Sequence, residues 1–270
     1  MKLFELRKAL KAQFQENNVD VEDADFIISE ILNVKRTELV LIDEISDDQV
    51  NEIKQKAELR LNKIPVDKIF HKSYFYGYEF IVDENVLTPR PETEILVEMA
   101  LRYIDEHKLK TVLDLCTGSG CVAITIKKNA EVDLTATDVS SKAIKIAKQN
   151  AEKLGAEIKF IKSNMFENID GKFDLIVSNP PYIDTDEIEM LDEEVKNNDP
   201  KLALDGGAMG LKFYNIIHDN LRKHLNENGF VIMEIGEEQR EMLLSMFNDF
   251  TFVDCIKDYA GLDRIMIFKK

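Results

Sequence analysis

The hydrophobic residues in the first part of the chain recur three or four positions apart, which is the spacing of an amphipathic helix. Ser46 opens the last of these stripes with the residues of a capping box, and Pro65 interrupts the pattern. We therefore predict a small helical bundle over residues 1–72 as a first domain. The stripes are Leu3, Leu6, Ala9, Leu10 and Phe14, then Phe26, Ile27, Ile31 and Leu32, then Val50, Ile53, Ala57 and Leu61.

From residue 73 onward the pattern changes to short runs rich in β-branched and aromatic residues. Residues 73–82 predict a hairpin with Gly77 near its turn, whose aromatic residues are expected to pack between domains. Further on, strands alternate with helical patterns, one of them near 237–248, which is typical of a doubly wound α/β sheet. We divide this part into a hairpin linker at 73–87 and a larger domain at 88–270. The predicted strands cover 111–115, 133–137, 157–162, 173–178, 229–235, 251–256 and 264–269.

An Asn-Pro-Pro-Tyr sequence at 179–182 directly follows one of these strands, at the end where open α/β sheets bind ligands. The side-chain carbonyl of Asn179 and the main-chain carbonyl of Pro180 can each accept one hydrogen of a planar NH2 group. Pro181 restricts the backbone, and Tyr182 offers a flat face for stacking. Two such acceptors would localise the nitrogen lone pair and make a poor nucleophile reactive. The plainer alternative is an ordinary turn at a strand end.

A glycine-containing turn follows the strand at 111–115, as in the opening of a dinucleotide-type βαβ unit. Only Gly118 and Gly120 of the full glycine pattern are present, and Ala123 takes the third place. Asp138 ends the next predicted strand roughly 20 residues further on, where an acid can accept both hydroxyls of a ribose. A carboxylate stabilised by the start of a helix is the alternative reading of Asp138.

These motifs resemble the release-factor glutamine N5-methyltransferase family, within the class I S-adenosylmethionine-dependent methyltransferases, and the resemblance runs over nearly the full length. The Asn-Pro-Pro-Tyr motif is shared with adenine-N6 and other amino-methyltransferases, so it specifies the chemistry more than the substrate. The segment Leu-Thr-Pro-Arg-Pro-Glu-Thr-Glu at 87–94 is much more particular to this family. Further matching segments lie at 114–120, 178–183, 199–204, 206–207, 234–236 and 258–261.

The resemblance implies a Rossmann-like sheet of seven strands with the last one antiparallel, and S-adenosyl-L-methionine as the cofactor. It implies that the substrate is the glutamine of the Gly-Gly-Gln motif in peptide chain release factors, methylated on its amide nitrogen by direct in-line transfer. Because a sulfonium is already an activated leaving group, we nominate no general base. The exposed face of the N-terminal helical domain then becomes a docking surface for the protein substrate.

The expected site contains three sets of residues. Asn179, Pro180 and Tyr182 are the expected catalytic residues, and together with Pro181 they are expected to bind the substrate amide. No metal is expected, because the four histidines are scattered without the spacing of metal ligands. The expected cofactor-binding residues are Cys116, Thr117, Gly118, Ser119, Gly120, Asp138, Met165 and Asn179.

Several positions leave alternatives open or depart from the family pattern. Asn164 stands where the family often has Asp, and Met165 replaces a common aromatic residue against the adenine. Residues 206–210 lack the family's Asp, so no role is assigned to a carboxylate there. Arg90 could contact the substrate or the cofactor carboxylate, or could form a structural salt bridge. The acidic, loop-like segment 184–199 could be a mobile lid or a solvated connection.

Composition narrows the range of partners. With 270 residues, of which 44% are hydrophobic, one large and one small domain fit. The net charge of −16 and the lack of any obvious basic cluster count against a nucleic-acid substrate. Acidic charge suits a partner with a basic surface, or simply keeps a protein in solution. Three cysteines without a CxxC pair, and no signal peptide or long apolar span, favour a cytoplasmic protein away from membranes, with Cys116 and Cys121 as small buried residues. A monomer is expected.

Two competing functions remain at this stage. An adenine-N6 nucleic-acid methyltransferase would hold its NH2 group in the same way, but it would need a base-flipping pocket and a basic recognition region. A non-catalytic adaptor would keep the fold for binding alone, and the intact Asn-Pro-Pro-Tyr motif disfavours it.

Overall fold

The computed structural model describes residues 1–270, and the chain divides into two compact units. The helical unit contains Met1–His71 together with Glu193–Asn198, and the sheet unit contains Lys72–Asp192 and Asp199–Lys270. The hairpin therefore belongs to the sheet unit, and one short helix from the second half of the chain belongs to the helical unit.

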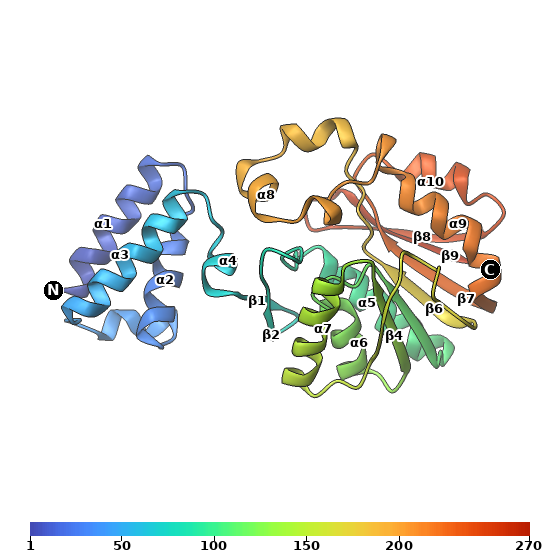
Figure 1. The fold of residues 1–270 in the computed structure, drawn as a ribbon, viewed down its shortest axis with the longest axis horizontal. Helices are drawn as coiled ribbons and strands as arrows, with labels where there is room; N and C mark the ends of the chain where they lie inside the picture. The colour runs from blue at the N-terminus through green and yellow to red at the C-terminus, as the bar shows by residue number, and fades with distance from the viewer. The chain divides into compact units, whose positions relative to one another are not determined.

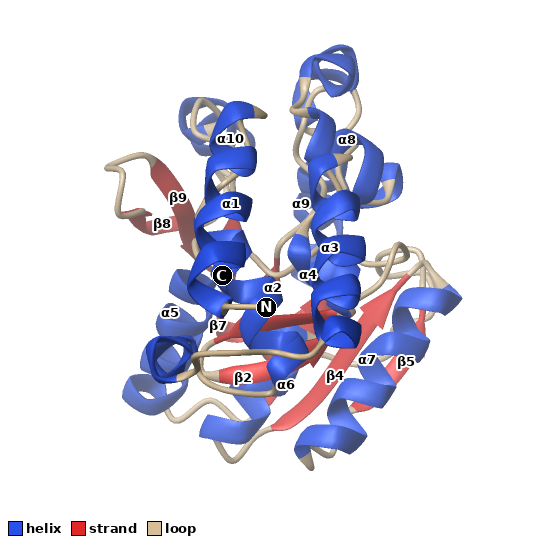
Figure 2. Cartoon of the chain, turned by 90° about the vertical axis from the view of Figure 1, so that its left-hand side faces the viewer, coloured by secondary structure: helices blue, strands red, loops and turns tan.

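The predicted hydrophobic stripes form the core of the helical unit. Leu6, Phe14, Ile27 and Ile53 are almost completely buried in one cluster. Ser46 caps its helix as predicted, because its Oγ accepts the main-chain N–H of Gln49 over 3.2 Å. Figure 2 draws the helices of the chain in blue and its strands in red. The helices of this unit are α1 (Leu3–Glu16), α2 (Glu22–Leu32), α3 (Asp47–Leu61), α4 (Val66–Phe70) and α8 (Glu193–Asn198), with a 3-10 turn η1 at Arg36–Leu41.

The side chain of Arg60 ties α8 to the rest of the helical unit. It is 4% exposed, and it donates from Nε to Asp23 on α2 over 2.6 Å and from Nη1 to Glu194 on α8 over 2.7 Å. Asn198 adds a hydrogen bond of 3.0 Å to the main-chain carbonyl of Lys63. A buried cation between two carboxylates gives each charge a partner, so segments far apart in sequence are joined here.

The sheet unit contains seven strands in the order β5-β4-β3-β6-β7-β9-β8. Strands β3, β4, β5, β6 and β7 run parallel, and β9 runs antiparallel to its neighbours β7 and β8. The expected doubly wound sheet with its last strand antiparallel is confirmed. The strands are β3 (Thr111–Leu115), β4 (Asp133–Asp138), β5 (Lys159–Lys162), β6 (Phe173–Ser178), β7 (Leu225–Glu234), β8 (Thr251–Lys257) and β9 (Asp263–Lys269).

Helices cover both faces of this sheet, because successive strand residues point to opposite faces. Val112 and Val177 pack into one core cluster with α5, α6 and α7, while Leu113 and Ile176 pack into the other with α9 and α10. Figure 1 shows the two helix layers on either side of the strands. The helices are α5 (Thr93–His107), α6 (Cys121–Asn129), α7 (Ser141–Leu154), α9 (Lys212–His224) and α10 (Arg240–Met246).

Three local predictions need correction. The hairpin of β1 (Lys72–Phe75) and β2 (Tyr78–Ile81) forms as expected, but Phe75 and Phe80 pack inside the core of the sheet unit and not between domains. The helix predicted near 237–248 begins only at Arg240. The segment 184–199 is not loop-like, because it contains α8 and the 3-10 helix η2 (Thr185–Met190). Two more 3-10 turns follow, η3 (Lys201–Ala203) and η4 (Ala208–Gly210).

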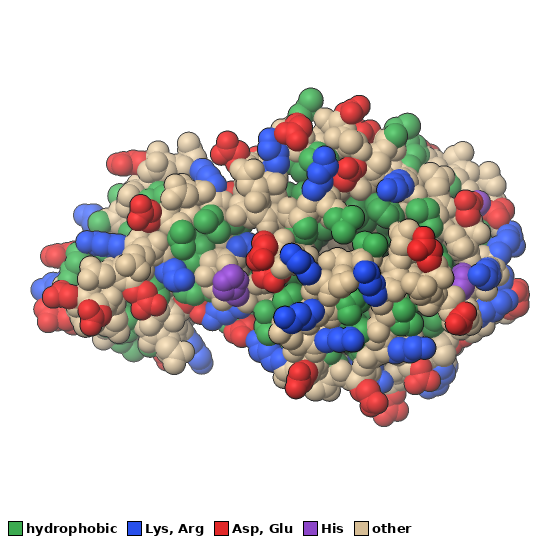
Figure 3. Space-filling view, viewed as in Figure 1, with side chains coloured by type: hydrophobic (Ala, Val, Ile, Leu, Met, Phe, Trp, Pro, Cys, Tyr) green, Lys and Arg blue, Asp and Glu red, His purple; other side chains and the backbone are tan.

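The surface of the sheet unit mixes both signs of charge. Figure 3 shows basic and acidic side chains interspersed on the visible face. One exposed face of α7 carries Lys142, Lys145 and Lys148, a short basic row that the sequence analysis did not single out. None of the helices combines the length and the apolar character that a membrane crossing needs.

Candidate active site

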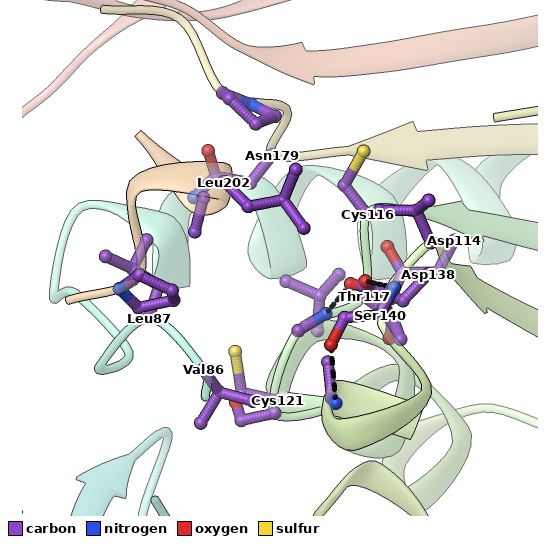
Figure 4. A pocket seen from close by; sticks show the side chains of 18 of the residues that line it. Val86, Leu87, Asp114, Cys116, Thr117, Cys121, Asp138, Ser140, Asn179 and Leu202 are labelled. Carbon is purple, nitrogen blue, oxygen red and sulfur yellow. Dashed lines mark hydrogen bonds between the residues drawn. The ribbon is translucent and has the colours of Figure 1, made fainter. Parts of the chain in front are cut away.

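A pocket lies at the carboxyl ends of β3, β4 and β6, where the order of the strands reverses (Figure 4). This is the position at which ligands bind in open α/β sheets. Its apolar wall includes Val86, Leu87, Leu202 and Phe213. Of the residues expected from the sequence, Cys116, Thr117, Gly118, Ser119, Asp138, Met165, Asn179 and Pro181 line the pocket, while Gly120, Pro180 and Tyr182 do not.

The carboxylate of Asp138 is held at the floor of the pocket by two main-chain N–H groups. Gly118 donates to Oδ2 over 3.0 Å, and Ser140 donates to Oδ1 over 2.8 Å. Since a carboxylate offers about four lone-pair sites, these two hydrogen bonds do not use its full acceptor capacity. Burial raises the pKa of Asp138, and the hydrogen bonds from Ser140 and Gly118 oppose that rise. Asp138 is thus prepared to accept two neighbouring hydroxyl groups.

The turn after β3 is shaped by hydrogen bonds to β3 and to the neighbouring strand β4. Thr117 donates from its hydroxyl to the buried carboxylate of Asp114 over 2.6 Å, and from its main-chain N–H to the carbonyl of Thr137 over 2.9 Å. Cys116 adopts a positive φ of 60°, which is uncommon for a residue with a side chain. The chain therefore turns sharply at the point where it forms the pocket wall.

Gly120 acts in packing rather than in the pocket wall. It has a φ of 83°, and a Cβ on it would lie 3.0 Å from Cδ1 of Ile124 and 3.1 Å from Cβ of Ala147. Glycine therefore permits the close approach of α6 and α7 behind the turn. Its expected contact with a cofactor stays a prediction.

The acids and thiols near the pocket have raised pKa values, chiefly through burial. Burial raises the pKa of Asp114 to about 7, while the hydrogen bond from Thr117 opposes this. It raises the pKa of Cys121 to about 12, and that of Cys116 still further with the charge of Asp138 nearby. Both thiols therefore stay protonated near neutral pH, so neither is suited to act as a nucleophile.

Asn179 is the polar residue that β6 presents to the pocket. Its Nδ2 donates to the hydroxyl of Thr93 over 3.1 Å, and that hydroxyl donates to the carboxylate of Glu234 over 2.7 Å. The carbonyl oxygen Oδ1 of Asn179 is left as an acceptor. Tyr182 donates to the other oxygen of Glu234 over 3.4 Å, and it is half-buried against the core cluster of α9 and α10. Its role in stacking stays a prediction.

The main chain of the Asn-Pro-Pro-Tyr motif is braced from the loop before α9 and from the residue that precedes α10. The side chain of Gln239 donates to the carbonyl of Tyr182 over 2.9 Å. Ile183 exchanges hydrogen bonds with Leu204 and Gly206, over 3.1 and 2.8 Å. A Cβ on Gly206 would lie 2.8 Å from the carbonyl oxygen of Pro181. The motif therefore has little freedom to move.

Arg90 forms an ion pair with a buried carboxylate. Its guanidinium donates to Asp199 over 2.8 Å, and the same carboxylate accepts the main-chain N–H of Thr88 over 3.3 Å. The structural salt bridge is present, and Arg90 also reaches the pocket wall. Asn164, another wall residue, donates to Glu167 over 2.7 Å.

Sequence reasoning missed several residues of this site. Thr93 and Glu234 contact the motif from α5 and β7, and the apolar wall comes from Val86, Leu202 and Phe213. Two signals were available, because Glu234 directly follows the apolar run 230–233, and both Thr93 and Glu234 lie in the family-like segments 87–94 and 234–236. The apolar wall residues lie in irregular segments and leave no periodic pattern.

The family model described as methyltransferase small domain matches residues 91–211. Three curated relatives carry the name release factor glutamine methyltransferase. That of Thermodesulfovibrio yellowstonii is 39% identical over 259 residues, 93% of each chain. That of Aquifex aeolicus is 35% identical and covers 100% of this chain and 96% of its own. That of Bacillus subtilis is 34% identical and covers 97% and 96%.

Solved structures agree on the fold. A methyltransferase from Pyrococcus furiosus has a TM-score of 0.56 at 20% identity, covering 80% of this chain and 98% of its own. The T. thermophilus 16S rRNA N2 G1207 methyltransferase, in complex with AdoMet and guanosine, has a TM-score of 0.52 at 14% identity, covering 74% and 49%. Because relatives above 30% identity extend over almost the whole chain, this protein belongs to the release factor glutamine methyltransferase family.

Proposed function

We propose that this chain transfers the methyl group of S-adenosyl-L-methionine to the side-chain amide nitrogen of glutamine in the Gly-Gly-Gln motif of peptide chain release factors. The shared name of its relatives supports the reaction and the protein substrate. The observation that carries the proposal is the carboxamide of Asn179, which lies in the pocket wall with its nitrogen tied to Thr93. A fixed carbonyl acceptor is what a primary amide substrate requires.

The pocket fits S-adenosyl-L-methionine in its donor set and its apolar surface. Asp138 has acceptor positions for two ribose hydroxyls, and Met165 offers an apolar contact for the adenine. The turn at 116–119 would hold the methionine part. When bound, the cofactor supplies a methyl group on a sulfonium sulfur.

The chain's own residues then bind and orient the amide. Oδ1 of Asn179 and the main-chain carbonyl of Pro180 would accept its two hydrogens and direct the nitrogen lone pair along the line of transfer. Tyr182 and Pro181 would restrict the amide plane. The nitrogen becomes far more acidic once methylated, so its proton can pass to water, and no residue is assigned as a base.

The partners follow from the same proposal. The helical unit would dock the release factor, and the enzyme would act as a cytoplasmic monomer without a nucleic-acid substrate. Three free cysteines are compatible with a reducing compartment. The net charge of −16 favours a partner with basic surface.

The test is methyl transfer from labelled cofactor to a release factor containing Gly-Gly-Gln, with duplex and single-stranded DNA and RNA as parallel substrates. We expect label only on the release factor, on its glutamine. The Asn179→Ala variant should lose at least about a hundredfold in kcat, in line with the loss of one positioned polar group in an active site. It should bind the cofactor nearly as well as the wild type. Labelling of nucleic acid in place of protein, or full activity of the variant, would overturn the proposal.

A further inference from the structure

A buried carboxylate is connected to two side chains of the Asn-Pro-Pro-Tyr motif. Glu234 lies at the end of β7 and is 2% exposed. One of its oxygens accepts the hydroxyl of Thr93 over 2.7 Å, and the other accepts the hydroxyl of Tyr182 over 3.4 Å. Thr93, itself 3% exposed, in turn accepts from Nδ2 of Asn179 over 3.1 Å. Glu234, Thr93 and Asn179 form a chain of hydrogen bonds with a definite direction.

The direction follows from counting hydrogens. An ionised carboxylate only accepts hydrogen bonds, so the single hydroxyl hydrogen of Thr93 must point toward Glu234. The oxygen of Thr93 can then only accept from Asn179, which selects Nδ2 for this side of the carboxamide. Reversing the amide would place Oδ1 against an oxygen that has no hydrogen to give. Oδ1 of Asn179 is consequently left for the substrate.

We infer that Glu234 and Thr93 are positioning residues that fix the carboxamide orientation of Asn179 for the transfer reaction. This inference rests on the proposed function, because it assigns to Oδ1 the task of accepting the substrate amide. It adds two residues, Thr93 at the start of α5, which lies in the pocket wall, and Glu234 at the end of β7, which does not line the pocket. Their effect on the reaction passes through Asn179.

The charge of Glu234 sets the direction of the hydrogen bonds from Asn179 through Thr93 to Glu234. A protonated Glu234 can donate to Thr93, whose own hydrogen is then free to turn toward Asn179 and favour the reversed amide. Burial raises the pKa of Glu234 to about 7, with Glu92 acting in the same sense and Thr93, Arg264 and Tyr182 opposing. The working carboxylate therefore predominates only above that pH, and kcat should fall as the pH drops through about 7.

The other groups around Glu234 affect how easily its carboxyl group ionises. Arg264 on β9 donates to Asp258 over 3.0 Å and to the carbonyl of Ile235 over 3.2 Å. Its positive charge favours the ionised form of Glu234. Tyr214 on α9 donates to the main-chain carbonyl of Glu234 over 2.8 Å, which leaves the carboxylate to Thr93 and Tyr182.

The kinetic test compares two substitutions at Thr93. The Thr93→Val variant keeps the shape but removes the hydroxyl, and an unpaired polar group at Asn179 should lower kcat by about tenfold or more. The Thr93→Ser variant restores the hydroxyl and should recover most of that loss. Cofactor affinity should stay within about threefold in both, since the hydroxyl of Thr93 is engaged by Glu234 and Asn179. Equal kcat values for the two variants would overturn the inference.

The pH profile supplies a readout that a merely structural role would not move. The decline of kcat below about pH 7 should be present in the wild type and in Thr93→Ser, and absent in Thr93→Val and in Glu234→Gln. If the decline persists unchanged in both of the latter, Glu234 does not set the orientation.

A measurement without substrate separates this inference from the proposed function. The side-chain NH2 signals of Asn179 can be assigned in ¹⁵N NMR spectra by their loss in an Asn179→Asp variant. One of the two hydrogens should exchange slowly with solvent in the wild type and quickly in Thr93→Val. Slow exchange without release-factor methylation would leave the hydrogen-bond chain standing and reject the function. Rapid exchange in the wild type would reject the chain, whatever the enzyme methylates.

Discussion

The α-carbon of Gly210 lies so close to the main-chain carbonyl of Tyr182 that a Cβ on Gly210 would overlap the carbonyl oxygen. Gly210 also adopts a φ of 66°, which disfavours any residue with a side chain. Glycine is therefore required at 206 and 210 for close packing, although the aspartate that the family has between them is missing here. These glycines allow the loop before α9 to pack against the Asn-Pro-Pro-Tyr motif.

Replacing Gly210 by alanine should therefore damage catalysis as well as stability. We expect a loss of about 1–2 kcal/mol in unfolding free energy from the backbone conformation alone. The displaced carbonyl of Tyr182 should add at least a tenfold fall in kcat, because small misplacements of a reacting group are costly. Urea unfolding and the release-factor assay measure the two effects.

Gly155 provides the matched control for that substitution. Its φ of 65° is almost the same, but a Cβ there would meet nothing within 4 Å. Gly155→Ala should lose only the backbone part of that stability, about 1–2 kcal/mol, and keep its kcat. If both variants retain full kcat, the bracing of the motif by Gly210 is unimportant.

Removing the carboxylate of Asp138 should weaken cofactor binding. In the Asp138→Ala variant two charge-assisted hydrogen bonds are lost, each worth about 1.5–3 kcal/mol, so the Kd for S-adenosyl-L-methionine should rise by about a hundredfold or more. Isothermal titration calorimetry measures this directly. Asp133 lies at the opposite, exposed end of the same strand, and Asp133→Ala should bind the cofactor like the wild type. Unchanged affinity in the Asp138 variant would show that the ribose does not bind to this carboxylate.

The buried acid Asp114 should make stability depend on pH. Its pKa is about 7 in the folded chain against an ordinary value of 3.8. The folded state therefore binds the proton more tightly, and this contribution to stability is present below about pH 4 and lost as the pH rises through about 7.

The Asp114→Asn variant removes that contribution while keeping an acceptor for the hydroxyl of Thr117. Its unfolding free energy should change less between pH 5.5 and pH 8, measured by urea unfolding on buffers of about equal ionic strength. Glu234 has a pKa raised in the same sense and supplies a residual slope. A variant with the same slope as the wild type would show that Asp114 does not titrate in this range.

Arg60 should hold α8 in the helical unit. Substituting it by methionine leaves Asp23 and Glu194 without their shared cation, which typically costs about 3 kcal/mol for a buried ion pair. Hydrogen exchange measured by mass spectrometry should accelerate at residues 193–198. Lys108→Met, which breaks an exposed pair with Asp105, should change neither stability nor exchange there. Unaltered exchange at 193–198 in the Arg60 variant would contradict the assigned role.

The parts of the fold that the sequence predicted well are those set by local patterns. The predicted bounds of β3 and β6 match the structure, since each is a short apolar run that stops at a clear signal, a glycine turn or Asn-Pro. The place of Asp138 in the pocket was predictable because it depends on a short spacing from the glycine turn; its contact with a ribose stays a prediction.

The parts that could not be predicted depend on contacts across long separations. Asn179 and Thr93 are 86 residues apart, and Thr93 and Glu234 are 141 apart, so no local pattern joins them. Acidic composition suggested a solvated loop at 184–199, but Arg60 gives Glu194 a buried partner that composition does not reveal. The aromatic hairpin was placed between domains because the sequence does not show which core its inner face meets.

The helical unit is built from two pieces of chain, since α8 is encoded far downstream of the first four helices. A gene fragment that ends at codon 71 would omit α8 from the helical unit. Deleting codons 1–71 instead would remove Arg60, the ion-pair partner of Glu194 on α8. Exchanging the N-terminal halves of two relatives would likewise pair Arg60 with a foreign residue at position 194. Chimeras and natural recombinants should therefore fold stably only when residues 1–71 and 193–198 come from the same parent.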